Sequence, residues 1–221
     1  MLRSIVTLGA LFASLTGAQA APPQLYVYVA DHQASRLYVV THKAGLLSFL
    51  GHEHAIVPMA WHADLCLADP IPDGAHATLV VPTDSLVIDS DSARTLAGLG
   101  RTPPRDERRQ VQDKMLDAKH LDAARFPDVR LDLRAVGALA NGKLTVQGTL
   151  RLHGVTRSVK LPVGVRHGDA GRLVLSGTLR IGQRDFGIQP EAVAGVVKVA
   201  NEVDLHILLA VRPTARVCGG T

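Results

Sequence analysis

Histidine is the residue type in this sequence that is best suited to bind a metal ion or a polar ligand group. His52 and His54 lie two residues apart, on either side of Glu53. Side chains two positions apart in a β-strand point to the same face, so a strand here would present both imidazoles together. A zinc site needs three or four converging ligands, and this pair supplies two. Two interpretations stay open: a weak metal site at His52 and His54, or polar groups that hydrogen-bond the headgroup of a bound ligand.

No enzymatic motif accompanies these histidines. The sequence contains no Gly-x-Ser-x-Gly elbow, no phosphate-binding glycine loop and no His-Glu-x-x-His helix. Asp185, beside Arg184, is better explained as a structural ion pair or turn residue than as a general acid. Because no nucleophile can be matched with a base, the sequence predicts a protein without catalytic residues or a cofactor.

The two cysteines, Cys66 and Cys218, are far apart in the chain and form no Cys-x-x-Cys redox motif. A disulfide between them is compatible with an oxidising compartment. Cys218 belongs to a Cys-Gly-Gly-Thr tail that the sequence assigns to no element. The paired and the free states both stay open.

The N-terminus has the organisation of a secretory signal peptide. A single cation, Arg3, precedes an apolar run from Ile5 to Leu15, and Ala18-Gln19-Ala20 supplies a small-residue cleavage site. The run is shorter than the roughly 20 apolar residues that span a bilayer. We therefore expect residues 1–20 to be removed and the mature chain to be periplasmic or secreted without stable membrane insertion. A retained anchor is the alternative.

The charge distribution argues against nucleic-acid binding. The formal net charge is +4, with four phenylalanines, three tyrosines and one tryptophan. A nucleic-acid interface would show a basic face with interleaved aromatic residues. The cations are instead scattered, apart from the arginines between Arg101 and Arg109, which suit a solvated loop and the start of a helix.

Two-residue alternation dominates the second half of the chain. Apolar residues occupy every second position with polar residues between them, the pattern of a strand with one buried and one solvated face. The segments with this pattern are 129–135, 143–152, 159–165, 172–181 and 197–209. Noisier strand-like segments precede them at 36–41, 51–67 and 75–81.

Turn residues and one helical segment organise these strands. Asn141-Gly142 suits a type I′ turn, which joins antiparallel strands. Between Glu107 and Leu121, apolar residues share one helical face among charged neighbours, which predicts a single inserted amphipathic helix. The polar rows carry many charges, so we place them in water and the apolar rows inside a soluble barrel, unlike an outer-membrane barrel. No linker or repeat divides the chain, which indicates one domain.

Three motifs make the chain resemble the YceI-like family. The segment Leu144–Arg157 ends in Gly154-Val155-Thr156-Arg157, and Ile181–Ile188 contains Arg184-Asp185-Phe186-Gly187. The third motif is the helix followed by Phe126-Pro127. The resemblance extends from Tyr38 to Val211. Departures are the histidine-rich segment at residues 51–54 and the long irregular stretch from Asp89 to Pro104.

The resemblance implies an all-β, antiparallel, lipocalin-like β-barrel of about eight strands, spanning residues 21–211, with a flexible tail at 212–221. It further implies a hydrophobic small-molecule ligand, namely an isoprenoid chain or isoprenoid quinone. Gly148 and Gly177 interrupt the apolar rows, where glycine leaves space or marks a bend or close approach. The candidate ligand-binding residues are Leu133, Leu144, Val146, Leu150, Leu173, Leu175, Leu179, Phe186, His52 and His54.

Alternatives to this function remain. One is an exported metal-binding protein that uses His52 and His54. Another is a ligand-free structural or stress-response module whose glycines only relieve barrel curvature and whose interior is solid. A homodimer is compatible with the sequence, which does not specify the oligomeric state.

Overall fold

The computed structural model describes residues 23–44, 53–190, 192–193 and 197–219. The expected signal peptide at residues 1–20 and the candidate ligand His52 lie outside the described residues. No helix in the described ranges is long and apolar enough to cross a membrane.

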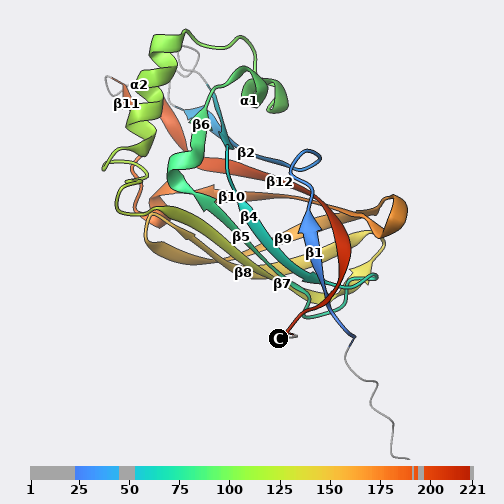
Figure 1. The fold of residues 1–221 in the computed structure, drawn as a ribbon. Coiled ribbons are helices and arrows are strands. Elements are labelled where there is room, and N and C mark those ends of the chain that lie inside the picture. Colours follow the sequence, from blue (N-terminus) through green and yellow to red (C-terminus); the bar gives the residue numbers. More distant parts are fainter. Residues whose placement is uncertain (1–22, 45–52, 191, 194–196, 220–221) are drawn as a thin grey trace, which may run out of the picture.

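Eight strands close into an antiparallel barrel, which confirms the predicted fold class (Figure 1). The ring closes because β1, the first strand, pairs with both β4 and β12, the last strand. In order around the barrel the strands are β1 (Tyr26–Ala30), β4 (His62–Leu67), β5 (His76–Pro82), β7 (Asp128–Ala140), β8 (Lys143–Leu152), β9 (Val155–His167), β10 (Leu173–Gly182) and β12 (Val197–Val217).

Three shorter strands prolong the barrel wall at one end. They are β2 (Arg36–Ala44), β3 (His54–Pro58) and β6 (Leu86–Ile88), which continue the sheet outward from β12 in the order β12-β2-β3-β6. Short interruptions separate β1 from β2, β3 from β4, and β5 from β6, the last being the 3-10 helix Thr83–Ser85. The two-residue strand β11 (Ala192–Val193) pairs with β12.

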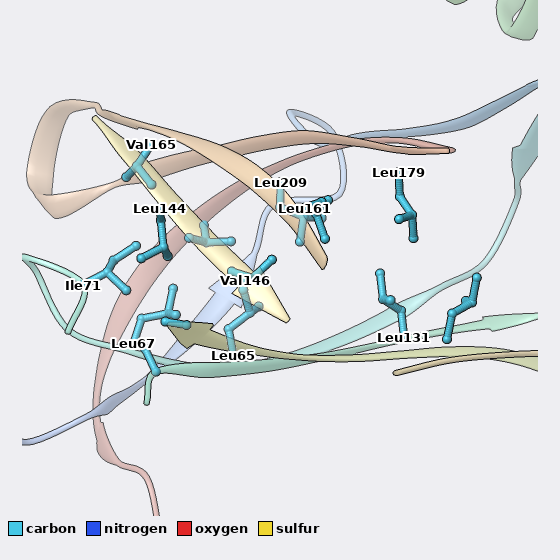
Figure 2. Close-up of a cluster of buried hydrophobic side chains, with 14 of the residues drawn as sticks. Leu65, Leu67, Ile71, Leu131, Leu144, Val146, Leu161, Val165, Leu179 and Leu209 are labelled. Atoms are coloured by element: carbon cyan, nitrogen blue, oxygen red, sulfur yellow. The ribbon is translucent and has the colours of Figure 1, made fainter. Parts of the chain in front are cut away.

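The alternating pattern explains the core, because one row of each strand faces inward. In β8, for example, Leu144, Val146 and Leu150 are buried, while Lys143 and Gln147 are exposed. Figure 2 shows buried side chains from several strands pointing toward one another inside the barrel. The apolar rows thus form the continuous core that the alternation predicts.

Two tight turns depend on positive φ angles. Asn141 and Gly142 have φ angles of 51° and 69°, as expected for the predicted type I′ turn. His153 and Gly154, with φ angles of 51° and 72°, make an equivalent turn between β8 and β9. Gly148 is required for another reason, since a Cβ atom there would collide with the backbone of Asp132 on the neighbouring strand. Gly148 therefore marks a close approach of two strands.

The described part of the chain contains two α-helices where the sequence predicts one. The predicted helix is α2 (Arg105–Leu116), which ends before Leu121 because Asp117 adopts extended backbone angles and its carboxylate accepts hydrogen bonds from the turn that follows. The additional helix is α1 (Asp91–Leu96), within the stretch interpreted as irregular. Ser90 caps the start of α1 by accepting a hydrogen bond from the Ala93 amide at 3.1 Å. Serine is a preferred residue at this position, so the start of the helix does carry a sequence signal.

The expected flexible tail at residues 212–221 is wrong for most of its length. β12 continues to Val217 and pairs with β1, and Cys218 forms a disulfide with Cys66 of β4. The Cys218 amide also donates to the Leu25 carbonyl at 3.0 Å. The alternation of the sequence fades after Leu209, so the pairing of the last strand depends on a partner that lies at the other end of the chain.

Candidate functional site

A cavity of about 470 Å³ lies at the end of the barrel that α2 covers. This volume lies within the range of roughly 300–1,000 Å³ that is typical of small-molecule sites. Its walls come from the apolar rows of β2, β3, β5, β7, β8 and β12. Representative wall residues are Leu37, Val39, Ile56, Leu79, Val129, Leu131, Leu150, Leu152, Leu205 and Ile207.

Helix α2 forms the cover of this cavity. Val111 and Met115 of the helix, followed by Leu121, line the space below it. Gln112 attaches the helix to the barrel, because its side-chain amide accepts from the Ile88 amide at 2.9 Å and donates to the Leu86 carbonyl at 2.7 Å. The Gln112 side chain thus makes two hydrogen bonds to the backbone of β6 that a neighbouring strand would otherwise make. Helix α2 is consequently hydrogen-bonded to the edge of the sheet.

The predicted ligand-binding residues fall into three groups. Leu150 and His54 line the large cavity. A second space of about 80 Å³ lies toward the opposite barrel end, near the disulfide. It is lined by Leu133, Leu144, Val146 and Leu175. These two groups do not share one site, because they line separate spaces that have only Ile207 in common.

The third group, Leu173, Leu179 and Phe186, lines neither space and belongs to the buried core. Phe186 is 1 % exposed, and its carbonyl hydrogen-bonds Nδ1 of His153 at 3.0 Å. His153 in turn meets the edge of Phe126. The residues that carry the family motifs therefore meet at one place and hold the barrel end together.

His54 is the polar residue of the cavity with the most elaborate surroundings. Its Nδ1 lies 2.5 Å from Oδ2 of Asp89, which is 1 % exposed. The other oxygen of Asp89 accepts from Arg94 Nη1 at 2.8 Å and from the Ala55 amide at 3.0 Å. Arg94 is buried as well and also donates to the Glu53 and Gly100 carbonyls. Asp89 thus joins β3 to α1 and orients the imidazole.

The charge state of Asp89 follows from these contacts. Burial acts to raise the pKa of this carboxyl, but hydrogen bonds from His54, the Ala55 amide and Arg94 outweigh burial and lower it. Asp89 is therefore ionised at neutral pH. The carboxylate accepts all of its hydrogen bonds, so the proton in the contact with His54 belongs to Nδ1.

A second polar cluster fastens β2 to its neighbours outside the cavity. His42 lies between Glu53 and Asp204, at 3.2 Å and 2.9 Å from their carboxylate oxygens. Arg180 makes two hydrogen bonds to Asp204, at 2.7 Å and 2.8 Å. The hydrogen bond with Asp204 is the main cause that raises the pKa of His42, whereas the Arg180 contact lowers the pKa of Asp204.

The raised pKa of His42 predicts a pH-dependent contribution to stability. This contribution is complete below the ordinary histidine pKa of about 6.5 and is lost as the pH rises through the higher folded-state value. The variant His42→Asn should therefore lose more stability at pH 5.5 than at pH 8.5, measured by urea unfolding. His76→Asn, at an exposed position, is the control. An equal loss at both pH values would show that protonated His42 does not stabilise the fold.

The metal interpretation gains no support from the described part of the chain. Within it, no three or more histidine, cysteine or acidic side chains are arranged to hold a metal ion. His54 is committed to Asp89 through Nδ1. Because His52 lies outside the described residues, the proposed histidine pair stays a hypothesis.

Sequence reasoning missed most of the polar site. Asp89, Arg94 and Gln112 were not nominated, although each one determines the position of a cavity residue or of the cover. One signal was present: an aspartate and an arginine five residues apart in a stretch that departs from the family pattern. Nothing in that spacing indicated the partner His54, which is 35 residues away from Asp89.

The fold and the cavity together define a closed antiparallel barrel with an apolar interior space beneath a helix. The family model described as "YceI-like domain" matches residues 28–211. The chain belongs to this family. Among proteins with curated descriptions, none matches the chain.

Two solved structures share the fold. BcnA from Burkholderia cenocepacia is 18% identical, with a TM-score of 0.60, and the match covers 82% of this chain and 98% of BcnA. A domain from Saccharophagus degradans is described as a polyisoprenoid binding domain implicated in plant cell wall breakdown. It is 17% identical, with a TM-score of 0.55, and the match covers 86% of this chain and 99% of that domain.

Proposed function

We propose that this protein binds the hydrocarbon chain of an isoprenoid, a polyisoprenoid or an isoprenoid quinone, in the cavity beneath α2, without catalysing a reaction on it. The apolar cavity of about 470 Å³ is the observation that carries this proposal. The polyisoprenoid binding domain with the same fold adds support for the class of ligand.

The energetics favour a long apolar ligand in this place. Each CH₂ group that leaves water contributes about 0.8 kcal/mol. The wall residues are predominantly leucine, isoleucine and valine, which offer dispersion contacts and no competing hydrogen bonds. A chain that buries only part of its length in the cavity therefore gains ample affinity.

We further propose that the protein works in the periplasm or outside the cell. The signal-peptide pattern of residues 1–20 supports this location. The Cys66–Cys218 disulfide supports it independently, because disulfides persist in oxidising compartments. Fractionation of a native host, with detection of the protein in the periplasmic or the culture fraction, tests this part of the proposal.

Filling the cavity should abolish ligand binding. Val129 lines the cavity from β7, and Val129→Trp places an indole in the space that the ligand needs. We expect the affinity for farnesol or a longer polyprenol to fall more than tenfold, measured by native mass spectrometry of the purified protein. Leu205→Trp, from the opposite wall on β12, should have the same effect.

Val136→Trp is the matched control, because Val136 belongs to the same strand but is 41% exposed. Its affinity should stay within about twofold of that of the unchanged protein, in keeping with the small effects of surface substitutions. Wild-type affinity in both cavity variants would place the ligand elsewhere. If the unchanged protein binds no isoprenoid at all, the proposed function is wrong.

A further inference from the structure

The position of His54 connects the polar network to the cavity. In β3, His54 shares the inward row with Ile56 and Pro58, and all three residues line the cavity. The His54 side chain is 15% exposed. Its ring is thus largely enclosed in an apolar space in which most other lining residues offer no hydrogen bond.

The two ring nitrogens of His54 have different roles. Nδ1 donates its proton to the ionised carboxylate of Asp89, which fixes the tautomer. Nε2 forms no hydrogen bond with any residue that the structure describes. In the neutral ring Nε2 carries a lone pair and no proton, so it is an acceptor.

The guanidinium of Arg94 balances the carboxylate of Asp89, with 2.8 Å between the bonded atoms. Asp89 therefore stays the acceptor for Nδ1, and the opposite edge of the ring, with Nε2, is the part of His54 that a molecule in the cavity can contact.

We infer that Nε2 of His54 accepts a hydrogen bond from the head of the ligand, and that the ligand therefore ends in a hydroxyl group. This inference rests on the proposed function and specifies it further. The hydroxyl of a polyprenol and the phenolic hydroxyl of an isoprenoid quinol supply the required donor. An oxidised quinone and a prenyl ether have only acceptors and leave Nε2 without a partner.

The expected discrimination is about tenfold in affinity. A single net hydrogen bond of ordinary strength corresponds to a factor of roughly three to ten, and a donor-free ligand additionally leaves a desolvated acceptor unpaired. Sites built to bind a hydroxyl reject the analogue that lacks it for this reason. The protein should thus bind the reduced form of an isoprenoid quinone in preference to the oxidised form.

The first test compares farnesol with farnesyl methyl ether, which have the same isoprenoid chain and differ in that a methyl group replaces the hydroxyl hydrogen. The second test compares an isoprenoid quinol with its quinone under anaerobic conditions. Native mass spectrometry with both members of a pair present measures their relative affinity. The unchanged protein should prefer farnesol and the quinol by about tenfold.

Variants of His54 identify the group responsible. His54→Leu should bind the alcohol and the ether equally. His54→Gln should recover part of the preference, because its amide can donate to Asp89 and accept from the ligand. His62→Leu, at a side chain that is 71% exposed, should keep the full preference.

The outcomes separate this inference from the proposed function. If the unchanged protein binds neither chain, the proposed function fails. If it binds both members of a pair equally, the cavity binds the chain but the role of His54 is wrong. A preference for the ether or the quinone, or a farnesol preference that persists in His54→Leu, would also overturn the inference.

Discussion

Replacement of Asp89 by alanine should lower the free energy of unfolding by about 3–5 kcal/mol, the range for breaking a buried ion pair by removal of one partner. Asp89 and Arg94 are 1% and 7% exposed, so Arg94 would keep a buried positive charge without its counterion. The Ala55 amide and His54 would lose their acceptor as well. Urea unfolding at pH 7 measures the loss.

Two further variants test this explanation. Asp84→Ala removes an exposed aspartate and should change stability by less than about 0.5 kcal/mol. The double variant Asp89→Ala with Arg94→Ala should be more stable than the sum of the single losses predicts, because the two residues interact directly. Additive losses, or a loss of less than about 1 kcal/mol in Asp89→Ala, would contradict the buried network as a source of stability.

Acid should weaken the same network in the unchanged protein. The pKa of Asp89 is lower in the folded state than in the unfolded state, so its contribution is present above the unfolded-state value of about 3.9 and is lost as the pH falls through the folded-state value. The stability difference between the unchanged protein and Asp89→Ala should therefore shrink in strong acid.

Removal of the disulfide should cause the second large loss in the free energy of unfolding. Cys66 and Cys218 are 152 residues apart. Cys66 lies in β4 and Cys218 directly follows β12, the two strands that pair with β1 on either side. Breaking the bridge frees a long loop in the unfolded chain, and such losses are typically about 2–5 kcal/mol. For a chain of this size, this loss corresponds to a melting temperature lower by roughly 4–20 °C.

The measurement compares the oxidised protein with the double variant Cys66→Ser with Cys218→Ser in thermal unfolding. The oxidised protein incubated with a reductant should melt like the double variant, and the double variant itself should not respond to the reductant. Ser158→Ala, an exposed change elsewhere, should melt like the unchanged protein. Equal melting of the oxidised and reduced forms would show that the bridge adds no stability.

The strands of the second half were predictable because each of them pairs with its neighbour in sequence. The alternation between Lys143 and Leu152 matches β8 residue for residue, and the Asn141-Gly142 turn carries its own conformational signal. β1, β6 and the last part of β12 were missed or assigned to a tail. Their pairing partners lie far away in the chain, and short segments of this kind carry little local pattern.

The candidate site was harder to predict than the fold. Every inward leucine satisfies the alternation equally well, so the sequence did not distinguish Leu150 beside the large cavity from Leu179 in the solid core. That distinction depends on where α2 covers the barrel. His54 was nominated for its spacing to His52, but its structural role comes from Asp89, a contact that only the folded chain creates.

The pairing of β1 with β12 also has a consequence for how fast the protein folds. Tyr26 pairs with Val217, so the two ends of the described chain must meet before the ring of strands is complete. Contacts between such distant residues slow folding, because a long loop must close before the contact contributes any stability. Until synthesis reaches the last strand, β1 and β10 each have an unpaired edge, and exposed edges of this kind promote aggregation. A nascent chain of this protein therefore depends on reaching its C-terminus before its strands find other partners.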